Sequence, residues 1–108
     1  MPLHKLSVEE LKAWLESAEA EPLIIDVREP WEYQVCRLES SIHIPMRQVP
    51  AQLSQLDRDR DIVVLCHHGI RSLQVCRFLA QQGFGRLFNV TGGIDAWAQQ
   101  VDPSMARY

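Results

Sequence analysis

The chain has 108 residues, of which 46% are hydrophobic and 23% are charged, and its net charge at neutral pH is −3. This length is sufficient for one domain with its own core, and an acidic balance without any basic run argues against nucleic acid as the main partner. No apolar stretch reaches membrane-spanning length, and the N-terminal residues lack the apolar segment of a signal peptide. Three cysteines without the spacing of a disulfide framework suit a reducing compartment, so we expect a cytoplasmic protein.

Helices and strands are predicted in alternation along the whole chain. In chain order they are a capped helix over 7–17, a strand over 23–27, a short helix from Glu29, a strand over 42–45, a helix over 49–56, a strand over 62–65, a helix from about Arg71 to Gly83, a strand over 87–90 and a closing helix around Trp97. Strands that alternate with helices indicate a parallel sheet covered on both faces. Because no repeat or linker interrupts the pattern, we expect a single domain over 1–108 with its core in about 4–100.

The segment with the clearest chemical meaning is Cys66-His67-His68-Gly69-Ile70-Arg71-Ser72. It places a lone cysteine after a strand buried on both faces, in a tight loop that leads into a helix. In open α/β sheets, ligands bind in the crevice at the carboxyl ends of the strands. Backbone N–H groups of the loop and the helix dipole favour an anion there, including a thiolate, and Arg71 adds a positive charge. This arrangement indicates a cysteine nucleophile at Cys66.

The other cysteines and the loop histidines have alternative interpretations. Cys76 lies on the inner stripe of the predicted helix and is expected to be inert core, whereas nothing near Cys36 marks it as catalytic. His67 and His68 either shape access to the cysteine and add partial charge, or fill exposed positions while backbone amides bind the ligand. A zinc site with Cys66 is disfavoured because adjacent side chains diverge and no fourth ligand is evident. We therefore expect no metal and no cofactor.

Three motifs together resemble the rhodanese family of sulfurtransferases. They are Asp26-Val27-Arg28-Glu29-Pro30-Trp31-Glu32-Tyr33, the segment from Cys66 to Ser72, and Gly83-Phe84 followed by Thr91-Gly92-Gly93-Ile94-Asp95-Ala96-Trp97. The resemblance extends over about residues 4–100 and implies a three-layer α/β/α fold around a five-stranded parallel sheet. Cys36-Arg37-Leu38 stands where the family usually has Gly-His-Ile, and His67 where it commonly has arginine or lysine. We expect these departures to alter selectivity without abolishing chemistry.

The resemblance also implies a two-step transfer of a sulfane sulfur atom. Cys66 takes sulfur from a small donor such as thiosulfate and passes it from a persulfide to cyanide, a small thiol or the thiol of a protein. The catalytic residues are then Cys66 and Arg71. The residues expected to bind substrate are His67, His68, Gly69, Ile70 and Ser72. Asp26 and Arg28 are assigned to structure at the end of a strand.

Two other function classes share this fold. Phosphatases and arsenate reductases use cysteine and arginine around an oxyanion, and non-catalytic binding modules lack the cysteine, which this chain retains. The loop from Cys66 through Arg71 has six residues, whereas the phosphatase relatives carry one more. A tetrahedral phosphoryl group needs a wider loop than one added sulfur atom, so the short loop favours sulfur transfer.

Overall fold

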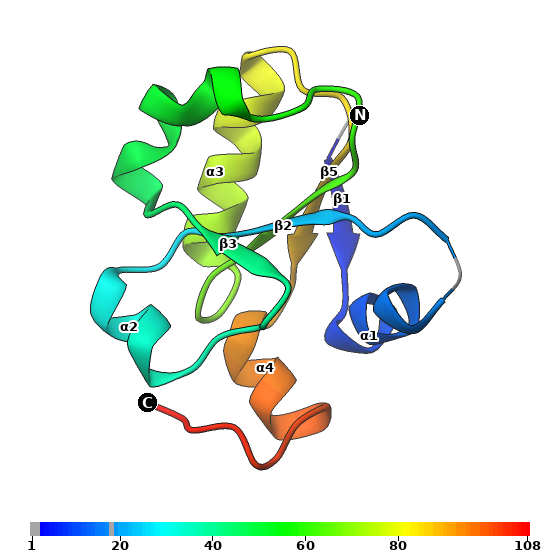
Figure 1. The fold of residues 1–108 in the computed structure, drawn as a ribbon, viewed down its shortest axis with the longest axis vertical. Helices are drawn as coiled ribbons and strands as arrows, with labels where there is room; N and C mark the ends of the chain where they lie inside the picture. The colour runs from blue at the N-terminus through cyan, green and yellow to red at the C-terminus, as the bar shows by residue number, and fades with distance from the viewer. Residues whose placement is uncertain (1–2, 18) are drawn as a thin grey trace.

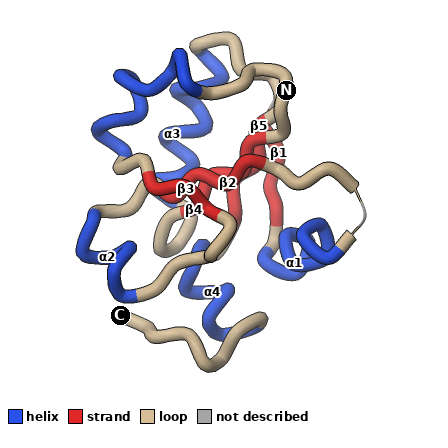
Figure 2. Tube along the Cα trace, viewed as in Figure 1, coloured by secondary structure: helices blue, strands red, loops and turns tan. Residues whose placement is uncertain are grey.

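The computed structural model describes residues 3–17 and 19–108, and its centre is a five-stranded sheet (Figure 2). The strands are β1 (Leu3–Leu6), β2 (Leu23–Asp26), β3 (Ser41–His43), β4 (Ile62–Leu65) and β5 (Leu87–Val90). Their spatial order is β1-β5-β4-β2-β3, and every neighbouring pair runs parallel. The expected five-stranded parallel sheet is confirmed, with β4 at its centre.

Helices cover both faces of this sheet, as Figure 1 shows. They are α1 (Val8–Glu16), α2 (Pro30–Val35), the 3-10 helix η1 (Met46–Gln55), α3 (Ile70–Gln81) and α4 (Gly93–Gln100). In the figure, α3 and η1 lie on one side of the strands, and α1 and α4 lie on the other. The three-layer α/β/α arrangement expected from the resemblance is therefore confirmed.

The central strand contributes to two hydrophobic cores. Ile62 and Val64 pack with the inner side chains of α3 and η1, whereas Val63 and Leu65 pack with those of α1 and α4. All four residues are at most 1% exposed. Side chains of a strand alternate between faces, and a strand covered on both faces is therefore apolar at every position. This is why an unbroken apolar run precedes the cysteine.

The helix starts follow from local hydrogen bonds. The Ser7 hydroxyl accepts the Glu10 N–H at 3.1 Å, and the Glu10 carboxylate accepts the Ser7 N–H at 2.9 Å, so the predicted capping box is confirmed. At the start of α2, the Glu32 carboxylate accepts the backbone N–H of Glu29 at 2.9 Å. Pro30 occupies the first turn, where its missing N–H leaves no hydrogen bond unmade.

Some elements differ from the sequence analysis. β1 was not located by periodicity, because it is an edge strand with the polar sequence LHKL, of which only Leu6 is buried. The helix expected over 49–56 begins earlier, at Met46, and is of the 3-10 type. β3 covers Ser41–His43 rather than 42–45.

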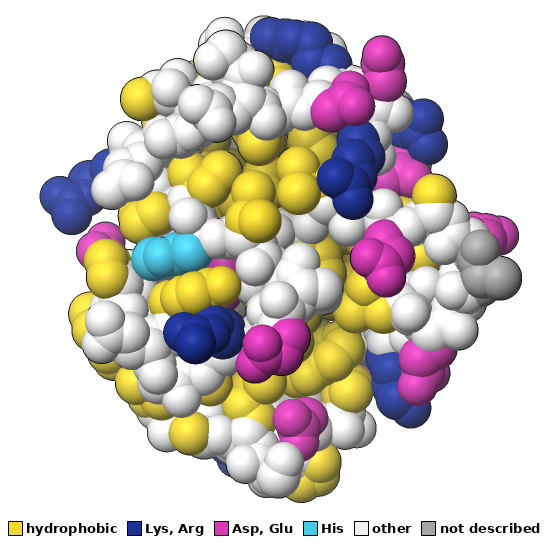
Figure 3. Space-filling view, viewed as in Figure 1, with side chains coloured by type: hydrophobic (Ala, Val, Ile, Leu, Met, Phe, Trp, Pro, Cys, Tyr) yellow, Lys and Arg dark blue, Asp and Glu magenta, His cyan; other side chains and the backbone are white. Residues whose placement is uncertain are grey.

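Surface features agree with the composition. Lysine and arginine side chains on the face drawn in Figure 3 are scattered rather than gathered into one basic patch. Among the residues that the structure describes, no helix combines the length and the apolar character that crossing a membrane requires.

Cys76 provides a test of the packing between α3 and the sheet. Its side chain is fully buried, and burial raises the pKa of the thiol to about 12. We expect iodoacetamide at pH 8 to leave Cys76 unlabelled in the native protein and to label it after unfolding in guanidinium. The half-buried Cys36 is the internal control and should react before Cys76 does. Labelling of native Cys76 at the rate of Cys36, measured by peptide mass spectrometry, would contradict this packing.

Candidate active site

Cys66 lies directly after the central strand, and its sulfur is enclosed by the loop that follows. Its side chain is 1% exposed. Sγ accepts backbone N–H groups from Gly69 at 3.1 Å and from Ser72 at 3.3 Å. One of these donors belongs to the loop and the other to the first turn of α3. Gly69 has φ +100°, a left-handed conformation that glycine adopts without strain, and a Cβ there would press against the β5–α4 turn.

Two buried polar side chains, those of Ser72 and Asn89, hold this loop through hydrogen bonds. The Cys66 thiol donates to the Ser72 hydroxyl at 3.3 Å, and that hydroxyl donates to Asn89 Oδ1. Asn89 in turn donates from Nδ2 to the Gly69 carbonyl at 3.2 Å. Ser72 is fully buried, so it contacts the sulfur rather than offering a free surface to substrate. Asn89 was missed by the sequence analysis, although a single polar residue in the strand LFNV was an available signal.

The N-terminus of α4 holds the loop from the other side. Ile94 N–H donates to the Cys66 carbonyl at 2.9 Å, and Asp95 N–H donates to the His67 carbonyl at 3.1 Å. Gly93 has φ +61°, and a Cβ at this position would overlap the His67 carbonyl group. Only glycine allows α4 to approach this closely. This explains the glycine pair in the turn from β5 to α4.

Arg71 spans from the loop to α2. Its guanidinium donates to both carboxylate oxygens of Glu32, at 2.6 and 2.8 Å. The pair raises the pKa of Arg71, and the hydrogen bonds from Arg71 lower the pKa of Glu32 to about 2, against a smaller opposing effect of burial. Arg71, the cation of the loop, thus ties the loop to a neighbouring helix. Glu32 was assigned no role by the sequence analysis.

Asp26 and Arg28 form a second ion pair at the end of β2. Their side chains are fully buried, with Nη2 and Oδ2 2.6 Å apart. Arg28 also donates to the Cys36 carbonyl at 2.7 Å and to the Glu32 carbonyl at 3.1 Å. Burial alone would lower the pKa of Arg28, but hydrogen bonds to Asp26 and Tyr108 outweigh it and raise the pKa. The pair therefore holds the segment after β2 against both ends of α2, which agrees with the structural role expected for it.

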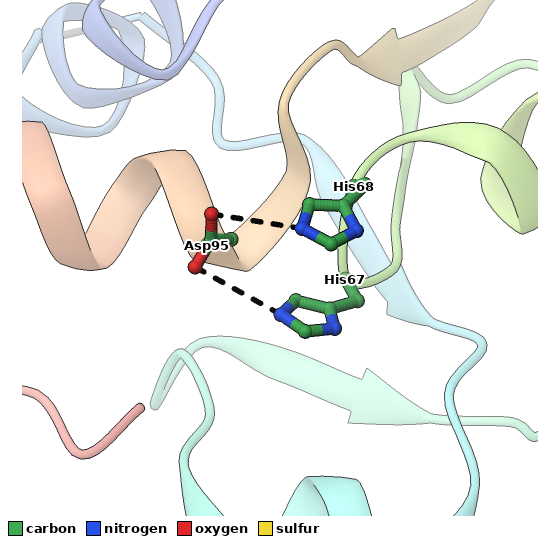
Figure 4. Close-up of side chains that lie close together, drawn as sticks. All are labelled: His67, His68 and Asp95. Carbon is green, nitrogen blue, oxygen red and sulfur yellow. Dashed lines mark ion pairs between the residues drawn. The ribbon is translucent and has the colours of Figure 1, made fainter. Parts of the chain in front are cut away.

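The two loop histidines turn toward the same carboxylate (Figure 4). Their rings stack with centroids 4.0 Å apart, and their Nε2 atoms lie 3.8 and 3.6 Å from the two carboxylate oxygens of Asp95. The expectation that these adjacent side chains diverge is wrong, because α4 brings Asp95 against the loop. His67 is mostly buried, whereas His68 is exposed. Burial and the nearby charge of His68 both lower the pKa of His67.

This histidine–aspartate cluster has donor atoms that lie within 4.8 Å of one another, which is close enough to hold a metal ion. Asp95 also accepts hydrogen bonds from Gln99 at 2.8 Å and from Arg107 at 3.2 Å. Of these partners, Arg107 carries the positive charge that balances the carboxylate. The cluster does not include Cys66, so its sulfur is not among these potential metal ligands.

The remaining predicted site residues, His68, Gly69 and Ile70, lie beside a cavity next to the loop. Ile70 is 70% exposed, although it is a large apolar side chain. A cavity of about 530 Å³ next to the loop is lined by His68, Gly69 and Ile70, together with residues of β1, α3 and the turn after β5. The structure thus places His68, Gly69 and Ile70 on this cavity, and it buries Ser72.

Comparisons with known proteins agree with this fold. The family model described as Rhodanese-like domain matches residues 7–100. A sulfurtransferase of Allochromatium vinosum is 40% identical over 84 residues, covering 78% of each chain, and a putative sulfurtransferase of Bacillus subtilis is 37% identical over 103 residues, covering 95% of this chain and 98% of that one. The crystal structure of a rhodanese-like domain protein from Staphylococcus aureus superimposes with a TM-score of 0.84, at 27% identity over 97% of this chain and 98% of that chain.

The pair between Glu32 and Arg71 gives a prediction about acid stability. A carboxyl group whose pKa is lowered by folding stabilises the native state above its unfolded pKa, and it loses this contribution as pH falls toward the folded pKa. For Glu32 that window runs from about pH 4.5 down to about pH 2. We expect wild type to lose about 2 kcal/mol more unfolding free energy across this window than Glu32→Gln does.

The measurement is urea unfolding followed by circular dichroism at several pH values. Glu39→Gln is the matched control, because Glu39 is exposed and makes no ion pair with a residue that the structure describes. Parallel pH profiles for wild type and Glu32→Gln would show that the ion pair contributes nothing to stability.

Proposed function

Since this chain belongs to the rhodanese-like family of sulfurtransferases, we propose that it moves a sulfane sulfur atom from an anionic donor such as thiosulfate to a thiophilic acceptor through a persulfide on Cys66. The observation that carries this proposal is the pair of hydrogen-bond donors around the Cys66 sulfur. Two backbone N–H groups at the N-terminus of α3 point at it, at 3.1 and 3.3 Å. Such donors stabilise the Cys66 thiolate, which attacks the sulfur donor and is released again when the sulfur is passed on.

The first step forms the persulfide. The Cys66 thiolate attacks the outer sulfur of thiosulfate, a sulfur–sulfur bond forms at the cysteine, and the bond to the central sulfur breaks. Sulfite leaves with the electron pair of the broken bond. Arg71 and the loop N–H groups provide the positive potential that favours an anionic donor at this site.

The second step returns the enzyme to its starting state. A cyanide ion or a thiolate attacks the outer sulfur of the persulfide, and the bond to Cys66 Sγ breaks. The product is thiocyanate or a new persulfide, and Cys66 leaves as a thiolate. Because the two half-reactions are separated by a covalent intermediate, the kinetics should be ping-pong. We propose a small thiol or a protein thiol as the acceptor in the cell, in a cytoplasmic location where the three cysteines stay reduced.

Cys66→Ser is expected to abolish turnover of thiosulfate and cyanide, because a serine hydroxyl is not ionised at neutral pH and cannot hold sulfane sulfur. Intact-mass spectrometry of the wild type should show a gain of one sulfur atom after thiosulfate, mapped to Cys66 and removed by cyanide. Cys76→Ala is the matched control, because it removes a buried thiol on α3 and should still acquire the sulfur. Substantial turnover by folded Cys66→Ser would refute the assignment.

The length of the loop separates sulfur transfer from phosphatase chemistry. The loop from Cys66 through Arg71 has six residues, and a loop of this length suits one added sulfur atom better than a bound phosphoryl group. We expect measurable sulfurtransferase activity and negligible hydrolysis of para-nitrophenyl phosphate by the same preparation. An insertion of one glycine between Gly69 and Arg71 should weaken sulfur transfer. Efficient phosphate release by wild type, without any persulfide on Cys66, would favour the phosphatase alternative.

A further inference from the structure

The segment after α4, residues 101–108, folds back toward the catalytic loop, as the position of the C-terminus beside α2 in Figure 1 shows. It leaves α4 through hydrogen bonds from the N–H groups of Val101 and Asp102 to the Trp97 carbonyl, at 2.8 and 2.9 Å. Met105 packs against the core formed with α1 and α4. Arg107 pairs with Asp95 at 3.2 Å. These contacts hold the segment along its length and place Tyr108 beside Glu32 and Arg28.

The hydroxyl of Tyr108 joins the two ion pairs of the site. It donates to Glu32 Oε2 at 2.7 Å and accepts from Arg28 Nη1 at 3.0 Å. Glu32 already binds Arg71, and Arg28 already binds Asp26. A continuous chain of hydrogen bonds therefore runs from the end of β2 through Tyr108 to the arginine of the catalytic loop. Hydrogen bonds to charged groups are the stronger ones, so this link is a stiff one.

The ring of Tyr108 covers the first histidine of the loop. The ring centroids of Tyr108 and His67 are 4.1 Å apart, and Trp31 meets Tyr108 edge-on at 5.2 Å. His67 therefore lies between two rings, those of His68 and Tyr108. Such contacts restrict the ring to one orientation, facing Asp95.

We propose that Tyr108 is a positioning residue of the active site, which holds Arg71 through Glu32 and holds His67 by ring contact, so that the loop keeps its shape around the Cys66 sulfur during transfer. This inference rests on the proposed function, since it assigns Tyr108 a role in binding the sulfur donor. Tyr108 does not touch the reacting sulfur. Its effect reaches the reaction through the two loop residues that it fixes.

The hydroxyl and the ring make separable contributions, which defines the variants. Tyr108→Phe removes the link between the ion pairs but keeps the ring on His67. Tyr108→Leu removes both. Tyr33→Phe is the matched control, because Tyr33 donates to the Ser41 carbonyl at 3.3 Å and stacks on His43, away from the catalytic loop.

Steady-state kinetics with thiosulfate and cyanide provide the first measurement. We expect Tyr108→Phe to raise the KM for thiosulfate about fivefold with little change in kcat, which is the effect of one lost hydrogen bond. Tyr108→Leu should raise it by about tenfold or more, and Tyr33→Phe should leave it unchanged. An unchanged KM in Tyr108→Leu would overturn the proposal.

Proton NMR of His67 provides a readout that does not depend on activity. The groups that face His67 are His68, Asp95, Glu32 and Arg71. Burial lowers the pKa of His67, and the ring of Tyr108 lies against the His67 ring. We expect the His67 pKa to rise toward its ordinary value in Tyr108→Leu and to stay low in Tyr108→Phe. The same pKa in wild type and Tyr108→Leu would show that the ring does not position His67.

The two tests distinguish failure of this inference from failure of the proposed function. If wild type acquires no sulfur on Cys66, the proposed function fails, while the NMR titration still tests whether Tyr108 positions the loop. If wild type acquires sulfur but the variants behave as Tyr33→Phe does, only the role of Tyr108 is refuted. Thermal unfolding of each variant shows whether a loss of activity reflects loss of the fold.

Discussion

The close approach of α4 to the loop that follows Cys66 is the constraint on which the candidate site depends. Two backbone N–H groups of α4 bind the carbonyls of Cys66 and His67, and Gly93 permits this contact by having no side chain. Because the C=O and N–H of a peptide point in opposite directions, the peptide N–H groups after these carbonyls face away from α4. The contact thereby fixes the orientation of the loop peptides, and N–H groups fixed in advance stabilise charge at low cost in reorganisation.

Around this contact, the charged residues hold neighbouring segments in place through ion pairs, in addition to providing charge. Arg71 binds Glu32 of α2, Arg28 binds Asp26 at the end of β2, and the hydroxyl of Tyr108 joins the two pairs. Buried pairs of this kind contribute modestly to net stability but strongly penalise any arrangement in which one partner is left alone. They therefore specify one position for the loop arginine. The positive charge near the sulfur is fixed in place rather than carried on a free side chain.

Structure that depends on neighbouring residues in the sequence could be predicted, whereas contacts between residues far apart in the chain could not. The strand before Cys66, the helix after it and the capping box at Ser7 depend on local periodicity and short-range hydrogen bonds, and these were predicted. The edge strand β1 was not, because its polar sequence is stabilised by pairing with β5. Likewise, His67 and His68 turn together toward Asp95 because another helix brings the carboxylate there, which no property of adjacent residues indicates.

By itself, the sequence determined the alternation of strands and helices, the place of Cys66 at the end of a buried strand, and the loop of six residues that ends in Arg71. These features follow from side-chain periodicity and from the geometry shared by parallel sheets. Only the tertiary structure decided which groups meet at the loop: Glu32 on Arg71, Asn89 on Ser72, Asp95 on the histidines and Tyr108 over His67. The physical reason is that these contacts join residues far apart in the chain, so their partners are set by how the helices pack on the sheet and not by local preference.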